Sequence, residues 1–160
     1  MPRDIVMTVY TFDELPTEKA KEAARDWWRD GIDSSWSDES LDSIKAFCAQ
    51  FGVKLSDWSV GPYAPFHYRA DHDNSNFRGV KLRDLARENY PTGYCLDADL
   101  SIAFYDHFKA NGDAKAAFDH ALHAGFKSWR DDMEWQLSDE AVDDALVCND
   151  YDFDENGNRV

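Results

Sequence analysis

Apolar and polar positions recur with fixed periods along the first part of the chain. Residues 6–12 alternate β-branched and aromatic side chains between two faces, which predicts a strand. Small and aromatic side chains then follow helical spacing over residues 16–29, and Lys21 and Arg25 are expected among the charged positions on the solvent side. Glycine commonly follows the last turn of a helix, so we expect this helix to end at Gly31.

The middle of the chain has the pattern of a helix followed by a hairpin. An apolar stripe at helical spacing predicts a helix over residues 37–50. Glycine and proline residues separate 53–60 from 66–70, which predicts the two strands of a hairpin. The polar stretch 71–79 is expected to form a loop, and residues 80–89 a short helix with its leucines on one side.

The last part of the chain is mainly helical in pattern. Residues 94–110 leave strand and helix open as alternatives, whereas residues 113–136 carry the longest helical pattern of the sequence. Ser138 is expected to cap a last helix that has two acidic residues in its first turn. Residues 151–153 then predict a short final strand.

Few strands and more numerous helices together predict an α+β fold. We expect several helices packed on a small, mostly antiparallel sheet, in which the first and last strands pair side by side. The length of 160 residues corresponds to a single acidic domain over residues 1–160.

Composition indicates a packed protein of a reducing compartment. Hydrophobic residues make up 43% of the chain and aromatic residues 14%, too many for a disordered acidic tail. The three cysteines are odd in number and far apart, which favours a reduced, cytosolic compartment. No long apolar run is present, so we expect neither a signal peptide nor a membrane-spanning helix.

The net charge of -15 is the unusual property of this sequence. Such a chain repels nucleic acid and anionic membranes and attracts basic protein surfaces. Residues 131–160 hold eleven acidic residues against one basic residue, so ten of the fifteen net charges lie there. Four carboxylates within residues 139–144 would give one charge per roughly 2.3 Å along the helix axis, against one charge per about 1.7 Å of duplex DNA. A solvated helix face is the alternative interpretation.

This asymmetry predicts a binding surface for a basic protein. An exposed aromatic side chain would anchor the contact, and the charges would steer association. The predicted partner-binding residues are Asp131, Asp132, Glu134, Asp139, Glu140, Asp143, Asp144 and Trp36.

Catalytic motifs are missing from the sequence. It contains no nucleophile elbow, paired-cysteine motif or phosphate-binding glycine loop, so we expect no enzymatic activity, no catalytic residues and no cofactor. His120 and His123 stand three residues apart in the longest predicted helix, which leaves a metal-dependent enzyme as an alternative. We expect no metal site, because polar surface histidines are the commoner origin of such a pair.

The end of the chain partly matches a calcium-binding loop. Asp152, Asp154, Asn156 and Gly157 have the spacing of its first half. The bidentate glutamate that such a loop requires does not follow. We therefore expect a tight turn.

Two stretches resemble a family of small phage and prophage proteins that are labelled antitoxins of toxin–antitoxin stability systems. They are VYTFDELPTEKAKEAARDWWRDG at residues 9–31 and LSDEAVDDALVCNDYDFDENGNR at residues 137–159. The resemblance implies a phage or mobile-element setting and carries over no catalytic residues.

Charge and setting lead to one principal functional hypothesis. The chain is expected to be a non-enzymatic inhibitor that binds a basic, nucleic-acid-handling host defence protein, of the anti-CRISPR or anti-restriction type, with a DNA-mimic-like surface. It would bind no nucleic acid directly and no membrane. The alternatives are an antitoxin that neutralises a cognate toxin and the metal-dependent enzyme described above.

Overall fold

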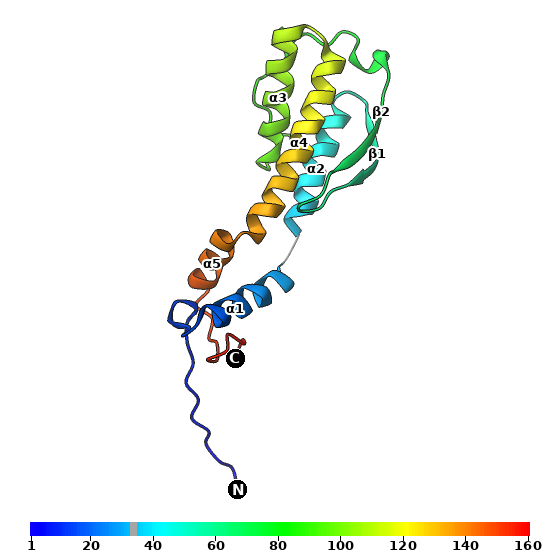
Figure 1. Cartoon of the computed structure of the whole chain (residues 1–160). Helices are drawn as coiled ribbons and strands as arrows, with labels where there is room; N and C mark the ends of the chain where they lie inside the picture. The colour runs from blue at the N-terminus through cyan, green and yellow to red at the C-terminus, as the bar shows by residue number, and fades with distance from the viewer. Residues whose placement is uncertain (33–34) are drawn as a thin grey trace. The chain divides into compact units, whose positions relative to one another are not determined.

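The computed structural model describes residues 1–32 and 35–160, without the side chains of residues 35 and 36 (Figure 1). Within these residues the fold is α+β, as predicted, with five α-helices and one two-stranded antiparallel sheet. The chain divides into two compact units: unit 1 comprises residues 1–33 and 135–160, and unit 2 comprises residues 34–134. The single domain stays a prediction.

Unit 1 is built around α1 (Glu18–Asp30) and α5 (Asp139–Cys148), with the short helix η1 (Phe12–Glu14) before them. Each α-helix begins at a side-chain cap: the Thr17 hydroxyl accepts from the amide of Ala20 at 3.0 Å, and the Ser138 hydroxyl accepts from that of Ala141 at 3.3 Å. The cap predicted at Ser138 is therefore confirmed. The buried apolar side chains of this unit are Phe12, Leu15, Ala20, Ala24, Val142, Leu146 and Phe153.

The predicted first and last strands are reduced to a single bridge. Tyr10 and Phe153 exchange two backbone hydrogen bonds of 2.8 Å each, so the expected pairing of these segments is confirmed at one position. Residues 1–9 form no regular structure, and the strand predicted over residues 6–12 is wrong there. The chain turns at Gly157 directly after the bridge, so no partner strand continues alongside residues 6–9.

Unit 2 places helices against a hairpin. The hairpin strands β1 (Lys54–Ser59) and β2 (His67–Asp71) pair antiparallel, with an irregularity between Leu55 and Asp57, which confirms the predicted hairpin. The helices are α2 (Ser35–Ala49), α3 (Leu96–Asn111) and α4 (Ala114–Leu137), the last of which continues into the residues of unit 1.

Aromatic side chains fill the core of unit 2. Phe47 stacks on Phe118 with ring centroids 5.5 Å apart, and Phe51 meets Phe104 at 4.9 Å. Gly125 allows α3 and α4 to approach closely, because a methyl group at this position would lie 2.4 Å from Leu100. Residues 94–110, left open by their pattern, belong largely to the helix α3.

One local prediction in unit 2 is wrong, and the structure adds detail to a second. Instead of a helix over residues 80–89, only the single turn η3 (Leu82–Asp84) forms. The predicted loop 71–79 contains a second short turn, η2 (Asn74–Phe77), capped by Asp73. None of the helices in residues 1–32 and 35–160 combines the length and the apolar character needed to cross a bilayer.

Candidate functional site

The acidic residues of α5 divide into two pairs with different surroundings. Arg25 from α1 makes a bidentate ion pair with Asp143, with N–O distances of 2.7 Å and 3.0 Å. Its Nη1 also donates to Glu18 and Glu22 at 2.9 Å and 3.0 Å. Hydrogen bonding to Asp143 is the main cause that holds the pKa of Arg25 above its ordinary value. The guanidinium therefore stays charged and binds α1 to α5.

Arg29 repeats this arrangement one turn later on α1. It donates to the carboxylate of Asp139 and, at 3.0 Å, to the backbone carbonyl of Leu137 just before α5. Desolvation opposes the charged form, but hydrogen bonds to Asp139 and Glu22 outweigh it and raise the pKa of this arginine. Asp139 and Asp143 thus form internal ion pairs and help to dock the two helices.

The second pair of α5, Glu140 and Asp144, lies on its exposed side. Among the residues that the structure describes, neither carboxylate has a hydrogen bond or ion pair. They stand four residues apart, one turn of the helix, so their charges lie about 6 Å apart along the axis. Of the four carboxylates counted in the DNA-like spacing, these two remain unpaired, which halves that charge density.

The other predicted acidic residues lie towards the end of α4. Asp131 pairs with Lys127 at 2.7 Å. The carboxylate of Glu134 accepts from the backbone amide of Tyr63 at 2.8 Å. Tyr63 lies in the hairpin loop with a left-handed φ of 58°, and this hydrogen bond helps to stabilise that conformation. These carboxylates therefore have local partners as well. A single face that joins them to α5 stays a prediction, and the side chain of Trp36 lies outside the described residues.

Asp131 and Asp132 also line a hollow in unit 2. Its volume is about 300 Å³, and its wall includes Tyr94, Asp99 and Trp129. Two carboxylates of α4 and one of α3 thus border the same space as two aromatic rings.

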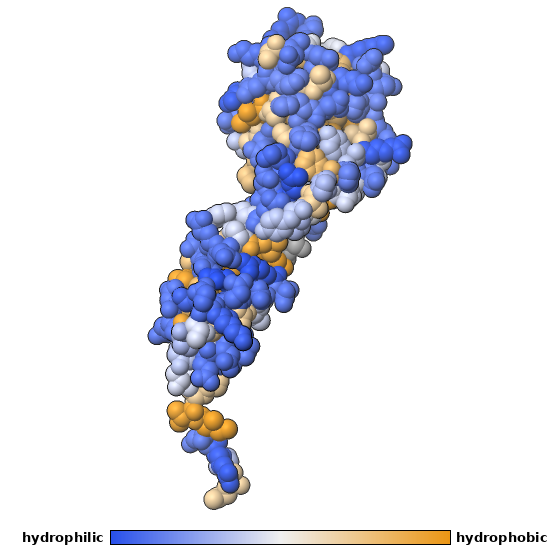
Figure 2. All heavy atoms as spheres, in the orientation of Figure 1, coloured by the Kyte–Doolittle hydropathy of each residue, from blue (hydrophilic) through white to orange (hydrophobic). Residues whose placement is uncertain are grey.

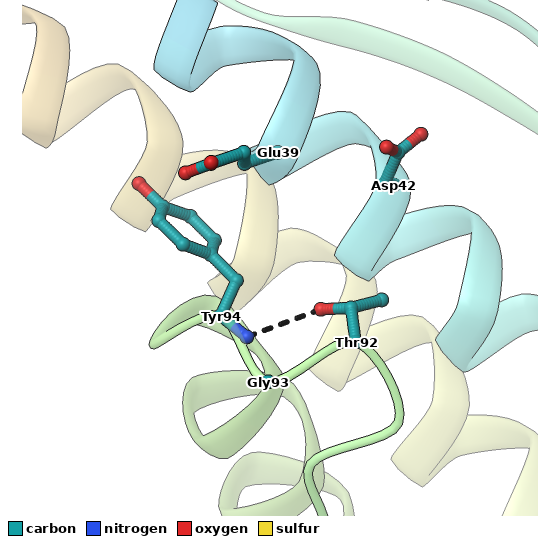
Figure 3. Close-up of a pocket in the computed structure, with 5 residues that line it drawn as sticks. All are labelled: Glu39, Asp42, Thr92, Gly93 and Tyr94. Carbon is teal, nitrogen blue, oxygen red and sulfur yellow. Dashed lines mark hydrogen bonds between the residues drawn. The ribbon is translucent and has the colours of Figure 1, made fainter.

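A second hollow of about 210 Å³ shares Tyr94 with the first. Figure 3 shows Glu39 and Asp42 on α2 across from Thr92 and Tyr94, which come from the turn before α3. The backbone amide of Tyr94 donates to the Thr92 hydroxyl at 3.2 Å. Hydrogen bonds hold this turn in its conformation: the buried carboxylate of Asp97 accepts from the amides of Thr92 and Gly93, each at 2.9 Å.

Burial changes the acid–base properties of the first hollow. Desolvation raises the pKa of Asp99, and a hydrogen bond from Ser128 opposes this shift only in part. Burial likewise raises the pKa of Tyr94. A positively charged group that enters this hollow would favour the ionised form of Asp99. The carboxylates of the wall therefore favour a cationic group in this hollow.

The histidines do not assemble a metal centre among the described residues. His120 stacks on His107 with ring centroids 4.6 Å apart, whereas His123 packs against Phe66 at 5.0 Å. No three histidine, cysteine, aspartate or glutamate side chains of residues 1–32 and 37–160 are grouped to hold a metal ion.

The calcium-like segment at the end of unit 1 is a hydrogen-bonded turn. One carboxylate oxygen of Asp154 accepts from the amides of Asn156 and Asn158 at 2.9 Å and 3.0 Å. The amide of Asn158 is the largest cause that lowers the pKa of this carboxyl group. Since the oxygens already accept these donors, the interpretation as a tight turn is confirmed.

Comparison with protein-family models, with characterised proteins and with solved structures finds no match for this chain.

The sequence pattern indicates where the charges lie along the chain but not which residues they pair with. Arg25 was expected at the solvent side of its helix, yet its side chain is only 11% exposed, which corrects that prediction. The hollow beside Tyr94 was also missed. Within α1, charges of opposite sign at i,i+3 and i,i+4 spacing were a signal for ion pairs inside the helix. The contact of Arg25 with Asp143 has no such local signal, because the two residues are 118 positions apart.

Proposed function

We propose that this chain is a non-enzymatic inhibitor that binds a basic, nucleic-acid-handling protein of a host defence system in the cytosol. Its acidic surface competes with nucleic-acid phosphates for the positively charged surface of the partner. The unpaired carboxylates Glu140 and Asp144 of unit 1 form the centre of the contact.

The observation that carries this proposal is the unequal distribution of charge between the two units. Unit 1 has 16 acidic and 6 basic residues, a net charge of -10, whereas unit 2 has 16 acidic and 11 basic residues, a net charge of -5. The smaller unit therefore carries twice the net charge of the larger one. Such a field attracts a basic surface and raises the rate of association.

The hollow of unit 2 supports the same class of partner. Asp99, Asp131 and Asp132 border it beside Tyr94 and Trp129. Carboxylates combined with aromatic faces are suited to an arginine side chain, which forms bidentate ion pairs and stacks on rings. We assign this hollow a supporting role, in which it holds one basic side chain of the partner.

Charge reversal combined with affinity capture tests the proposal. The Glu140→Lys/Asp144→Lys variant is compared with Asp57→Lys/Asp84→Lys, which changes the net charge equally at two exposed positions of unit 2. Each tagged protein is incubated with lysate of the host at low and at high salt, and the captured proteins are identified by mass spectrometry.

The proposal expects a basic nucleic-acid-binding protein that the unmodified chain captures at low salt and releases at high salt. The reversal on α5 should abolish this capture, and the reversal in unit 2 should retain it. Equal capture by both variants would reject the acidic surface of α5 as the binding site.

A second function, neutralisation of a cognate toxin, has one observation in its favour. The stretches 9–31 and 137–159, which resemble the antitoxin-labelled phage proteins, both lie in unit 1 and include α1 and α5. The most acidic unit is thus also the part with the resemblance. A toxin encoded beside this gene that keeps its full activity with an equimolar amount of the protein would exclude this function.

A further inference from the structure

Residues 1–9, here called the arm, hold more than half of the large apolar side chains of unit 1 that are exposed. Val6 is 97% exposed and Ile5 90%, and Met7 and Val9 are also exposed. Figure 2 shows orange, hydrophobic atoms over part of this arm, next to blue, hydrophilic atoms nearer its end. A cluster of neighbouring exposed apolar residues of this kind marks an interaction site.

The arm begins from a fixed point at two isolated β-bridges. The amide of Tyr10 donates to the carbonyl of Phe153 and its carbonyl accepts from the amide of Phe153, and Phe153 in turn bridges Arg159. The arm therefore continues from the outer residue of these bridges, Tyr10. In an extended chain the backbone groups of Val9 and Met7 point away from the side that Tyr10 uses. The edge they form is open to a new strand.

The backbone of the arm is also unpaired. Within the described part of the chain, no amide or carbonyl of residues 1–9 bonds to another residue. The segment Val6-Met7-Thr8-Val9 combines β-branched and apolar side chains, a composition typical of strands. The sequence therefore predicted a strand here because the segment has strand character, and only its partner is missing from unit 1.

We propose that residues 5–9 add as a β-strand to an exposed sheet edge on the basic partner. This inference rests on the proposed function and specifies how the partner is recognised: main-chain hydrogen bonds supply affinity and apolar side chains supply register. Charge complementarity identifies the occupant. The arm is joined to a unit of net charge -10, which attracts a strand flanked by lysine or arginine. The same charge opposes pairing with a second copy and insertion into an anionic membrane.

A synthetic peptide of eight alternating lysine and valine residues serves as the probe, because it combines a basic face with strand propensity. The control peptide alternates lysine and proline, which keeps the charge but removes half of the donors of a strand. Binding of both peptides to the full chain is measured by calorimetry. Hydrogen exchange of the amides of residues 5–9 is followed in parallel.

The lysine–valine peptide should bind about tenfold more tightly than the control, the effect of one to two strand hydrogen bonds, and should protect residues 5–9. Met7→Pro should remove this difference, whereas Met7→Val, which keeps the amide and the strand propensity, should retain it. The thermal unfolding of both variants should equal that of the unmodified chain, since the arm lies outside the core.

The outcomes separate this inference from the proposed function. Equal binding of both peptides, unaffected by Met7→Pro but lost in Glu140→Lys/Asp144→Lys, would overturn strand addition and leave the acidic surface in place. No binding of either peptide would overturn the inference. A dimer of the chain alone in sedimentation, or protection of the arm by phosphatidylcholine vesicles in place of peptide, would assign the arm to another occupant and also overturn it.

Discussion

Single residues decide how closely the elements of this protein approach one another. Gly157 has a φ of 82°, and a methyl group on it would lie 1.9 Å from the backbone oxygen of Ala20 in α1. The sequence pattern at this position predicts a turn, but the contact with α1 exists only in the folded unit.

Replacement of Gly157 by alanine should destabilise unit 1 by about 3 kcal/mol or more, because steric overlap with backbone adds to the cost of the left-handed conformation. Gly61→Ala is the matched control, since no atom lies within 4 Å of a methyl group there. Urea unfolding compares the two variants. A similar midpoint for both would show that α1 moves to accept the methyl group.

Burial of Asp99 gives the stability of unit 2 a pH dependence of unusual sign. Its pKa is higher in the folded state than in the unfolded state, so the folded protein binds the proton more tightly. Stability contributed by this group is therefore present at acidic pH and is lost as the pH rises through its raised pKa. Asp99→Asn should remove this loss. The melting temperatures of the variant and the unmodified chain are compared between about pH 4 and pH 7. If both melting temperatures change with pH in the same way, the pH dependence does not come from Asp99.

At the scale of elements, the pairing of α1 with α5 depends on arginines that face inward. Arg25 binds Asp143 on α5 and two glutamates on its own helix. The first-turn acids of α5 are favoured by the helix dipole, but Asp143 lies one turn further along. Its charge is stabilised by tertiary pairing, which no periodicity of α5 alone reveals.

Replacement of Arg25 by methionine should cost about 2 kcal/mol, because three carboxylates lose their common partner while Asp143 remains partly exposed to solvent. Lys19→Met, at an exposed position of the same helix, should change the free energy of unfolding little. Asp143→Asn in the Arg25→Met background should recover part of the loss. A double-mutant cycle in urea measures this coupling, and additive effects would show that the pair contributes nothing.

At the scale of the whole molecule, the net charge of -15 favours expansion. Added salt screens charges over a distance of about 30 Å at 0.01 M and about 8 Å at 0.15 M. The internal ion pairs, such as Arg25–Asp143 at 2.7 Å, lie well inside both distances. Salt therefore weakens the long-range repulsion much more than it weakens the pairs.

The melting temperature should rise when sodium chloride increases over this range at pH 7. Near pH 4.5, the isoelectric point of the sequence, the net repulsion is absent and the rise should vanish. Scanning calorimetry at both pH values provides the measurement. A fall in melting temperature at pH 7 would show that the ion pairs dominate over repulsion.

The sequence by itself determined α1, α2, α4 and α5, the hairpin and the unequal distribution of charge. Helical period and end signals located α1, α2, α4 and α5 because these depend on neighbouring residues. The sequence also indicated strand composition in residues 6–12, but a strand needs a partner to pair with. Because the chain turns at Gly157, only the Tyr10–Phe153 bridge forms.

The tertiary structure alone decided which charges are available to a partner. Asp139 and Asp143 pair with arginines more than 100 residues away, whereas the carboxylates of Glu140 and Asp144 have no ion pair among the described residues. The hollow beside Tyr94 likewise brings α2, α3 and α4 together. The physical reason is the same in both cases: local period sets the direction of a side chain on its own helix, but its partner depends on which element packs against that face.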